Sequence, residues 1–333
     1  MVQSSYNQLL EENMKRLITS LILITLACSL FAAGKKEAAT PEQWPDGAVT
    51  VICPWAVGGV ADIVNRKMAT YGQEVLGQPV LATNELGAGG NVALTNYLQN
   101  QANSLNLILG GEGAFSIAPN TPGSEALVFT YDDYEPIINL YSSIFVMTAD
   151  AKLGIKDLDA LKAYGADKTL KVAVNGVAGS EAFLAKALFK ELGLKLELVS
   201  YNGANLALDA AAKGETQFAI SHQSQAQASV EAGTLTPVVA FDKEGLKFGV
   251  FAGVKGVGEY GYNAYFRNRC FLLARKGTDP AIIQKVSNAY LKILAKDDIT
   301  ELFKTMLIEI DPLDPAAMDQ HVADVIQIVK ANQ

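Results

Sequence analysis

Short apolar runs alternate along most of the chain with longer segments in which apolar residues recur at helical spacing. The first run, VTVIC at 49–53, precedes a segment at 61–76 whose apolar residues return every three or four positions. Runs at 79–83 and 105–109 flank a further helix-like segment at 91–101. An alternation of strands and helices is typical of an α/β fold.

The same alternation continues to the C-terminus and predicts two α/β units. Further strands are expected at 137–141, 143–147, 169–174, 195–201, 216–220, 235–241 and 268–274. Further helices are expected at 156–163, 181–192, 204–213, 223–232, 279–295, 297–306 and 314–331. We expect the strand at 235–241 to begin the return to the first unit. A second unit inserted into the first, with two chain crossings, predicts a hinged binder of two lobes.

Three glycine-containing turns connect a predicted strand to a predicted helix, at 54–59, 84–91 and 175–180. A helix that begins there presents backbone N–H groups without intrahelical partners, together with the positive end of its dipole. Such a helix start binds anions without the help of Lys or Arg. Ligand sites of open α/β sheets lie beyond the carboxyl ends of strands, where all three turns are expected. The turns therefore predict a carboxylate site.

Composition is that of a globular protein, with 50% hydrophobic and 19% charged residues. The formal net charge of −8 argues against binding to nucleic acid or to an anionic membrane surface. An acidic ligand would need a locally positive pocket, and backbone dipoles can supply one without any change in net charge.

The sequence offers little for catalysis. It contains two histidines, His222 and His321, and no G-x-S-x-G, H-E-x-x-H or Walker motif. No Cys/His cluster has the spacing of metal ligands, and the glycines of GAGGN are not spaced as in a dinucleotide-binding turn. We therefore expect no enzyme activity, no catalytic residues, no metal and no cofactor.

The N-terminus has the pattern of an export signal over residues 1–33. Lys15 and Arg16 precede an apolar run at 17–26, which is the length of a secretory h-region. Met14 stands directly before these basic residues and is a second candidate for the start of the protein. The chain is expected in the periplasm or elsewhere in the cell envelope.

Two cleavage sites compete in this leader. Cys28 follows Thr-Leu-Ala as in a loose lipoprotein box, whereas Ala32-Ala33-Gly34 suits ordinary signal peptidase. The Lys/Glu/Ala/Thr-rich tether at 34–45 favours lipidation of Cys28 and membrane anchoring of the domain. A retained transmembrane anchor is the third alternative.

Beyond the leader the chain contains two cysteines, Cys53 and Cys270. Both lie in apolar, strand-like runs. We favour two buried free thiols over a disulfide, since spacing alone cannot bring two cysteines together.

Five segments resemble one family in order along the chain. PWAVGGVAD resembles the P-F-x-x-G-G-x-x-D signature of the substrate-binding proteins of tripartite tricarboxylate transporters, the Bug family. The likeness continues through GQPVLATNELGAGGN, VAVNGVAGSEAFLAKALFKELG, SYNGANLALDAAAKGETQFAI and LLARKGTDPAIIQKVSNAYLKIL. It covers nearly the whole chain after the leader.

The resemblance implies a type II periplasmic-binding-protein fold with hinge strands. It places lobe 1 at 46–142 and 236–333, and lobe 2 at 143–235. It implies that backbone N–H groups and bridging waters hold a di- or tricarboxylate or related acid between the lobes. The receptor, a monomer, would deliver this acid to large and small integral-membrane transporter subunits. A sensing module of the same fold that feeds a signalling partner is the alternative.

The resemblance also names ligand-binding positions. Those that match the family's contacts are Trp55, Ala56, Val57, Gly58, Gly59, Val60, Asp62, Gly89, Gly90, Asn91, Ala114, Ser116, Asn175, Gly179, Ser180, Tyr201 and Asn202. Asp62 has two interpretations, contact with a ligand amine or capping of its own helix. Trp55 either lines the pocket, which we favour, or packs in the core.

The chain departs from the family at three places. Asn202 replaces a Lys, Arg269 replaces an aromatic residue, and Ser221-His222 replaces Asp-Asn. Arg269 and His222 are therefore added to the candidate ligand contacts. Their alternatives are a surface position for Arg269 and a neutral, hydrogen-bonding structural role for His222.

Overall fold

The computed structural model describes residues 43–100, 103–120, 127–177, 179–247 and 249–332. The chain divides into residues 1–43 and a compact unit from Trp44 to Gln333, and the fold below is that of the second unit. The predicted leader, with Cys28, and the tether up to residue 42 lie outside the described residues. Within the described ranges, no helix combines the length and apolar character needed to cross a bilayer.

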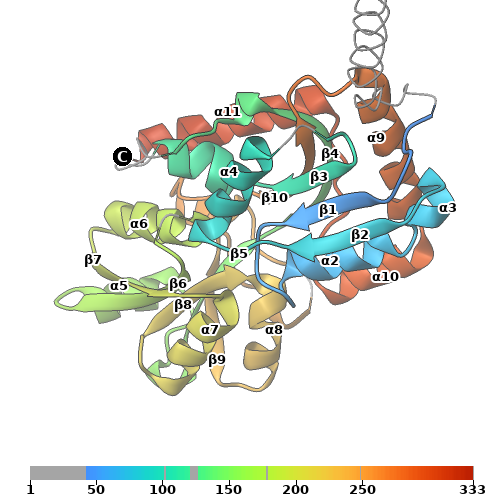
Figure 1. The fold of residues 1–333 in the computed structure, drawn as a ribbon. Coiled ribbons are helices and arrows are strands. Elements are labelled where there is room, and N and C mark those ends of the chain that lie inside the picture. The colour runs from blue at the N-terminus through green and yellow to red at the C-terminus, as the bar shows by residue number, and fades with distance from the viewer. Residues whose placement is uncertain (1–42, 101–102, 121–126, 178, 248, 333) are drawn as a thin grey trace, which may run out of the picture. The chain divides into compact units, whose positions relative to one another are not determined.

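The first sheet has the strand order β2-β1-β3-β10-β4 (Figure 1). Its strands are β1 (Val49–Cys53), β2 (Val80–Asn84), β3 (Asn106–Gly110), β4 (Tyr134–Ser143) and β10 (Asn268–Arg275). β1 is parallel to β2 and β3, whereas β10 is antiparallel to β3 and β4. The carboxyl ends of the three parallel strands therefore meet at one edge.

The second sheet has the order β7-β6-β8-β5-β9. Its strands are β5 (Phe145–Asp150), β6 (Thr169–Asn175), β7 (Lys195–Tyr201), β8 (Phe218–His222) and β9 (Leu235–Ala240). β6 is parallel to β7 and β8, and β5 is antiparallel to β8 and β9. Our assignment of the strand at 235–241 to the first unit is wrong, because β9 pairs with β5 in the second sheet. The remaining lobe boundaries stay a prediction.

Helices cover both sheets, as predicted for an α/β fold. They are α2 (Val60–Ala69), α3 (Gly72–Leu76), α4 (Asn91–Gln99), α5 (Leu158–Gly165), α6 (Ser180–Leu192), α7 (Ala204–Lys213), α8 (Gln223–Glu231), α9 (Pro280–Leu294), α10 (Asp297–Thr305) and α11 (Pro315–Ala331). The helix predicted at 61–76 is two helices. The break allows Gly72 to pack directly on Val80, where an added Cβ would lie 2.3 Å from Cγ2.

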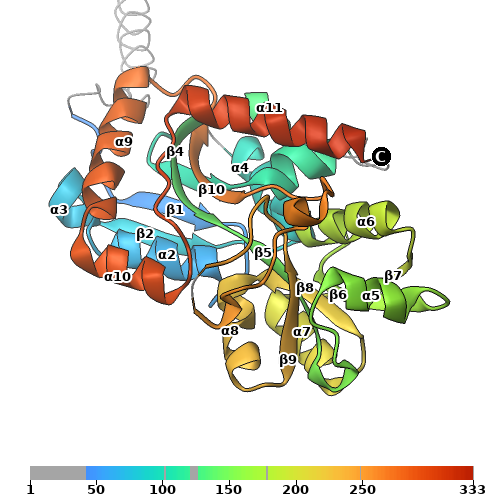
Figure 2. The ribbon, with the colours of Figure 1, turned by 180° about the vertical axis from the view of Figure 1, so that it is seen from behind.

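Each sheet is buried on both faces. Helices α2, α9 and α10 pack on one face of the first sheet, and α4 and α11 pack on the other (Figure 2). In the second sheet, α5 and α6 cover one face and α7 and α8 the other. Cys53 and Cys270 are buried free thiols in the first core, which confirms that prediction.

Helix α11 contributes to both cores. Met318 and Val322 pack with the first sheet, whereas Val325 and Val329 pack with the second. All four side chains are at most 3% exposed. Full burial of an aliphatic side chain of this size contributes about 1.5–3 kcal/mol, so α11 stabilises both halves of the molecule.

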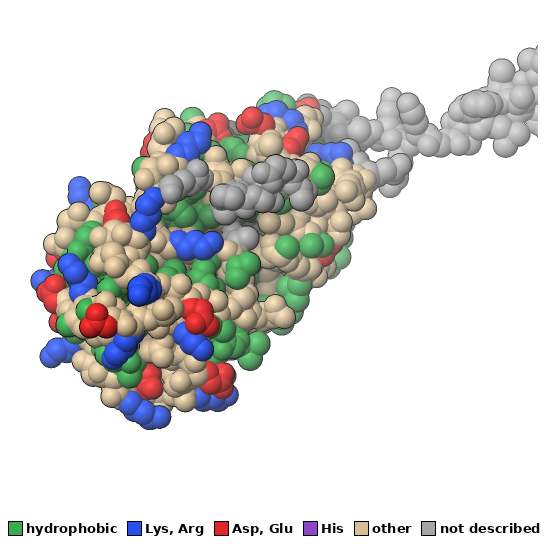
Figure 3. Space-filling model, turned by 90° about the vertical axis from the view of Figure 1, so that its left-hand side faces the viewer, with side chains coloured by type: hydrophobic (Ala, Val, Ile, Leu, Met, Phe, Trp, Pro, Cys, Tyr) green, Lys and Arg blue, Asp and Glu red, His purple; other side chains and the backbone are tan. Residues whose placement is uncertain are grey.

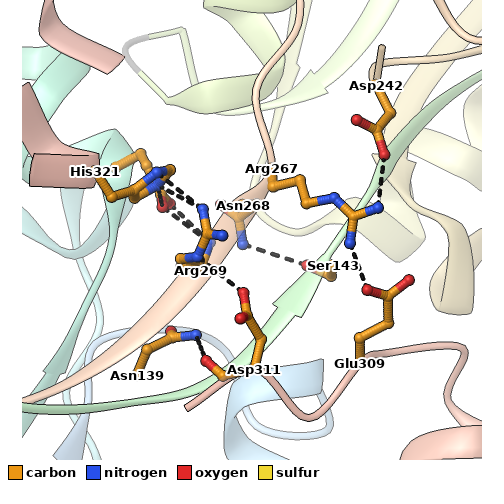
Figure 4. Close-up of polar contacts among 10 residues, drawn as sticks. Asn139, Ser143, Asp242, Arg267, Asn268, Arg269, Glu309, Asp311 and His321 are labelled. Atoms are coloured by element: carbon orange, nitrogen blue, oxygen red, sulfur yellow. Dashed lines mark hydrogen bonds and ion pairs between the residues drawn. The ribbon is translucent and has the colours of Figure 1, made fainter. Parts of the chain in front are cut away.

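The chain passes twice between the sheets, as predicted. The first passage leads from β4 to β5 through Ile144, and the second is the long connection from β9 to β10. Beside the second passage, Arg267 forms ion pairs with Asp242 and Glu309 (Figure 4). The two-lobe α/β architecture is thereby confirmed.

Candidate binding site

A cavity of about 120 Å³ lies where the carboxyl ends of strands from both sheets meet. Its walls combine strand-to-helix turns with residues of the central strands. The lining residues are Trp55, Ala56, Gly59, Val60, Ala61, Gly89, Gly111, Glu112, Gly113, Ala114, Tyr141, Phe145, Asn175, Gly179, Ser180, Glu181, Gly203, Ala204, His222, Gln225, Asn268, Arg269 and Cys270.

The turn between β1 and α2 supplies donors from the first sheet. Gly59 is the N-cap of α2 in an extended conformation, and the first ladder bond runs from the Ile63 N–H to the Gly59 carbonyl at 3.0 Å. The N–H groups of the preceding helical residues, Val60 and Ala61, therefore have no place in that ladder. Both residues line the cavity. The positive end of the α2 dipole thus faces the cavity.

Asp62 holds this turn from within and does not line the cavity. Its Oδ2 accepts the Gly58 N–H at 2.9 Å, and its Oδ1 pairs with Arg66 Nε at 2.9 Å. Burial alone would raise the pKa of Asp62, but Arg66 and the Gly58 amide lower it overall. Asp62 therefore stabilises the turn before α2, whose N-cap Gly59 receives no side-chain hydrogen bond, and its contact with a ligand amine stays a prediction.

Asp62→Asn is expected to lower the free energy of unfolding at pH 7 by about 2 kcal/mol, since it weakens hydrogen bonds to a charged group. The folded-state pKa of Asp62 lies below its ordinary 3.8, so its contribution is present above that pH and is lost as the pH falls through the folded-state pKa. Urea denaturation should therefore show a smaller difference at pH 3 than at pH 7. Asp209→Asn, on the exposed side of α7, is the control; an equal loss at both pH values would contradict the role of Asp62.

The second sheet presents three helix starts to the same cavity. Helices α6, α7 and α8 follow β6, β7 and β8, and their N-caps are Gly179, Gly203 and His222. Gly203 has φ 132°, a value that L side chains rarely adopt. Each N-cap residue lines the cavity. Helix dipoles from both sheets therefore favour a negative charge there.

The two halves touch at Gly113, the first residue of a π-helical turn (Gly113–Ile117) after β3. A Cβ added to Gly113 would lie 3.4 Å from Ser180 Oγ and 3.7 Å from Ser180 N. Gly113 belongs to the first half, which is the first sheet with its helices. Ser180 begins α6 in the second half, which is the second sheet with its helices. Both residues line the cavity.

Arg269 lines the cavity, but its guanidinium is engaged elsewhere (Figure 4). Its Nε donates to Asp311 at 3.0 Å, and its Nη1 lies 2.8 Å from His321 Nδ1. Arginine is only a donor, so His321 Nδ1 accepts and its Nε2–H donates to Glu112 Oε1 at 2.7 Å. The buried Glu112 carboxylate also accepts the Arg269 backbone N–H at 2.9 Å. His321, which lies in α11, therefore links Arg269 to Glu112.

His222 lines the cavity as a neutral side chain. Its Nδ1 lies 2.9 Å from Ser143 Oγ, and its ring stacks on Phe145 with 4.2 Å between centroids. Burial lowers the pKa of His222 to about 4, so the imidazole is uncharged at neutral pH. This matches the hydrogen-bonding alternative given for His222.

The structure brings eleven of the predicted positions to the cavity: Trp55, Ala56, Gly59, Val60, Gly89, Ala114, Asn175, Gly179, Ser180, His222 and Arg269. It leaves Val57, Gly58, Asp62, Gly90, Asn91, Ser116, Tyr201 and Asn202 out of the lining. Val57 is 70% exposed, whereas Ser116 is buried with its hydroxyl on the Val322 carbonyl. Contact of any of these residues with a ligand stays a prediction.

Several lining residues were not predicted. They include Glu112, Tyr141, Phe145, Glu181, Gln225, Asn268 and Cys270. Most lie on strands β4, β5 and β10 or just inside a helix, where side chains commonly serve packing or capping. Glu112 follows the Gly110-Gly111 turn at the end of β3, and that position beyond a strand was the available signal.

Positive side chains do not create the site. Among the described residues that line the cavity, Arg269 is the one Lys or Arg, and its guanidinium is already paired. On the face shown in Figure 3, basic and acidic side chains are interspersed and form no single basic patch. Binding of an anion would therefore depend on backbone dipoles.

Comparison with known proteins identifies relatives along almost the whole described chain. The model of the tripartite tricarboxylate transporter family receptor matches residues 64–331. Protein BugT of Bordetella pertussis is 25% identical over 290 residues, which are 85% of this chain and 87% of BugT.

Solved structures share the fold. MatC from Rhodopseudomonas palustris with bound malate superposes with a TM-score of 0.78 at 24% identity, over 87% of this chain and 100% of MatC. A second R. palustris protein, with adipate, has a TM-score of 0.78 at 20% identity, over 87% of this chain and 98% of its own.

Proposed function

Because the chain belongs to the tripartite tricarboxylate transporter receptor family, we propose that it captures a small organic carboxylate for uptake by a membrane transporter of that type. The family is one of receptors, which supports a binding role and not a catalytic one. The proposed partners of this receptor, itself a monomer, are one large and one small integral-membrane subunit, and a transporter described as tripartite supports two further components.

One observation carries the choice of ligand. Helix starts from both sheets converge on a cavity where, among the described lining residues, Arg269 is the one cationic side chain and is already paired. Such a site favours an anion whose oxygens accept backbone N–H groups. The malate and adipate bound by the two R. palustris structures support a carboxylate.

The proposed cycle uses the two halves as a clamp. The α2 turn binds one carboxylate group, and the N-termini of α6, α7 and α8 contact the remainder of the ligand. Closure at Gly113 and Ser180 then removes the ligand from water, and each half supplies differential contacts that favour the closed state.

The proposed location is the periplasmic side of the membrane. The leader at 1–33 supports export, and the tether at 34–45 supports anchoring through a lipid on Cys28. Intact-mass measurement of the protein from the membrane fraction distinguishes a lipidated Cys28 from cleavage before Gly34.

A thermal-shift screen against small organic acids tests the ligand class. A ligand at about 100 times its Kd adds about 2.7 kcal/mol to the free energy of unfolding, which raises the melting temperature measurably. We expect a shift with at least one carboxylate and none with neutral sugars or metal ions. Shifts with sugars alone would overturn the proposal.

A further inference from the structure

Glu181 is a buried carboxyl that the proposed function does not use. It stands in the first turn of α6, lines the cavity and is 7% exposed. Among the described residues, its own backbone N–H is the one hydrogen-bond donor found for its carboxylate. A carboxylate can accept about four hydrogen bonds, so the described protein groups satisfy only part of this capacity.

The position of this carboxylate changes what the second half of the cavity can bind. Its Oε2 would lie 3.4 Å from a Cβ added to Gly179, the N-cap of α6. The side chain thus folds back over the start of its own helix. The protein's own carboxylate thereby takes the place that a second carboxylate of the ligand would need at the α6 N-terminus.

The described residues that line the cavity include no cationic side chain that pairs with Glu181. The other titratable side chains that line the cavity are Glu112, Tyr141, His222, Arg269 and Cys270. Glu112 is bound by the Arg269 amide and His321, and the Arg269 guanidinium is held by Asp311 and His321. His222 is neutral, because burial lowers its pKa to about 4.

We propose that Glu181 selects small organic acids that carry a protonated amine together with their carboxylate. The inference rests on the proposed function: the α2 turn binds the carboxylate of the ligand, and Glu181 accepts hydrogen bonds from its ammonium group. Such a ligand supplies the missing positive charge inside the cavity. A ligand with two carboxylates and no amine would bring its two negative groups close to the Glu181 carboxylate. Each helix N-terminus offers only about half a positive charge to offset these three negative groups.

The pH dependence follows from the state of Glu181. Burial raises the pKa of Glu181 to about 7, so in the empty protein at pH 6 it is largely protonated. An amine ligand requires the ionised form, and its affinity should therefore increase by about tenfold from pH 6 to pH 8. A ligand that uses protonated Glu181 as a donor would show the opposite trend.

Matched pairs of acids, measured by isothermal titration calorimetry, test the proposal. Aspartate with succinate, glutamate with glutarate and alanine with propionate differ by one amine. We expect the amine member to bind at least about tenfold tighter in the best pair, and Glu181→Gln to remove most of that preference. Glu231→Gln, on the exposed end of α8, is the matched control and should preserve it.

Three outcomes contradict the proposal in different ways. Tighter binding of the acids without an amine, with affinity that increases toward pH 6, would make Glu181 a proton donor and overturn the proposed selectivity. A preference for amines that survives in Glu181→Gln would assign the selectivity to another group. Binding of no acid from either set would defeat the carboxylate function itself.

Discussion

Val60→Pro should weaken carboxylate binding by about tenfold to a hundredfold without unfolding the protein. Val60 is the first residue of α2, and proline at that position removes an N–H that the helix itself does not use. Gly59, which precedes it, has φ −74° and ψ 166°, a conformation that proline accepts after it. The expected loss is that of one hydrogen bond to a charged group, about 1.5–3 kcal/mol.

The control for this variant is Val60→Ala. It also removes the valine side chain beyond Cβ, but it retains the backbone N–H. Calorimetry on both variants separates the amide from the side chain, and circular dichroism verifies that α2 is intact. Equal affinities of Val60→Pro and Val60→Ala would show that the α2 amide does not bind the ligand. The helix-start mechanism would then be wrong for the first half of the site.

Gly113→Leu should reduce ligand affinity by about fivefold to a hundredfold through the closure step. A Cβ on Gly113 would already lie 3.4 Å from Ser180 Oγ, so we expect the remaining atoms of a leucine side chain to crowd this contact. Overpacking of this kind costs about 1–3 kcal/mol, and it acts on the closed state alone. Small-angle X-ray scattering should show the wild type contracting with ligand and the variant contracting less.

Gly113→Ala is the matched control, since its Cβ at 3.4 Å from Ser180 Oγ makes an ordinary contact. It should retain affinity within about twofold to threefold, and the melting temperatures of the ligand-free variants should agree. If Gly113→Leu binds as tightly as Gly113→Ala, closure at this contact contributes nothing to binding.

Local sequence patterns predicted most of the helices and strands. The predicted strand at 49–53 coincides with β1, and the predicted helix at 204–213 coincides with α7, because periodicity and flanking glycines act within a few residues. Which strand another strand pairs with depends on tertiary contacts between residues that are distant in the sequence. For that reason β9 was placed in the wrong unit, although its existence was predicted.

Site residues could be predicted where backbone N–H groups at a helix start are the expected ligand contacts. Gly59 and Gly179 stand at helix starts that the turns indicated, and both line the cavity. Side-chain roles were harder, since an acid in the first turn of a helix ordinarily complements the dipole, and Glu181 fits that pattern equally well. Arg269 was expected as a ligand contact, but its partners Asp311 and His321 come from distant parts of the chain.

Helix α11 couples the stability of the two hydrophobic cores. This helix provides Met318 and Val322 to one core and Val325 and Val329 to the other. Neither core is complete without α11, so local unfolding of this helix would loosen both of them. We therefore expect the two sheets and their helices to unfold together in one cooperative transition.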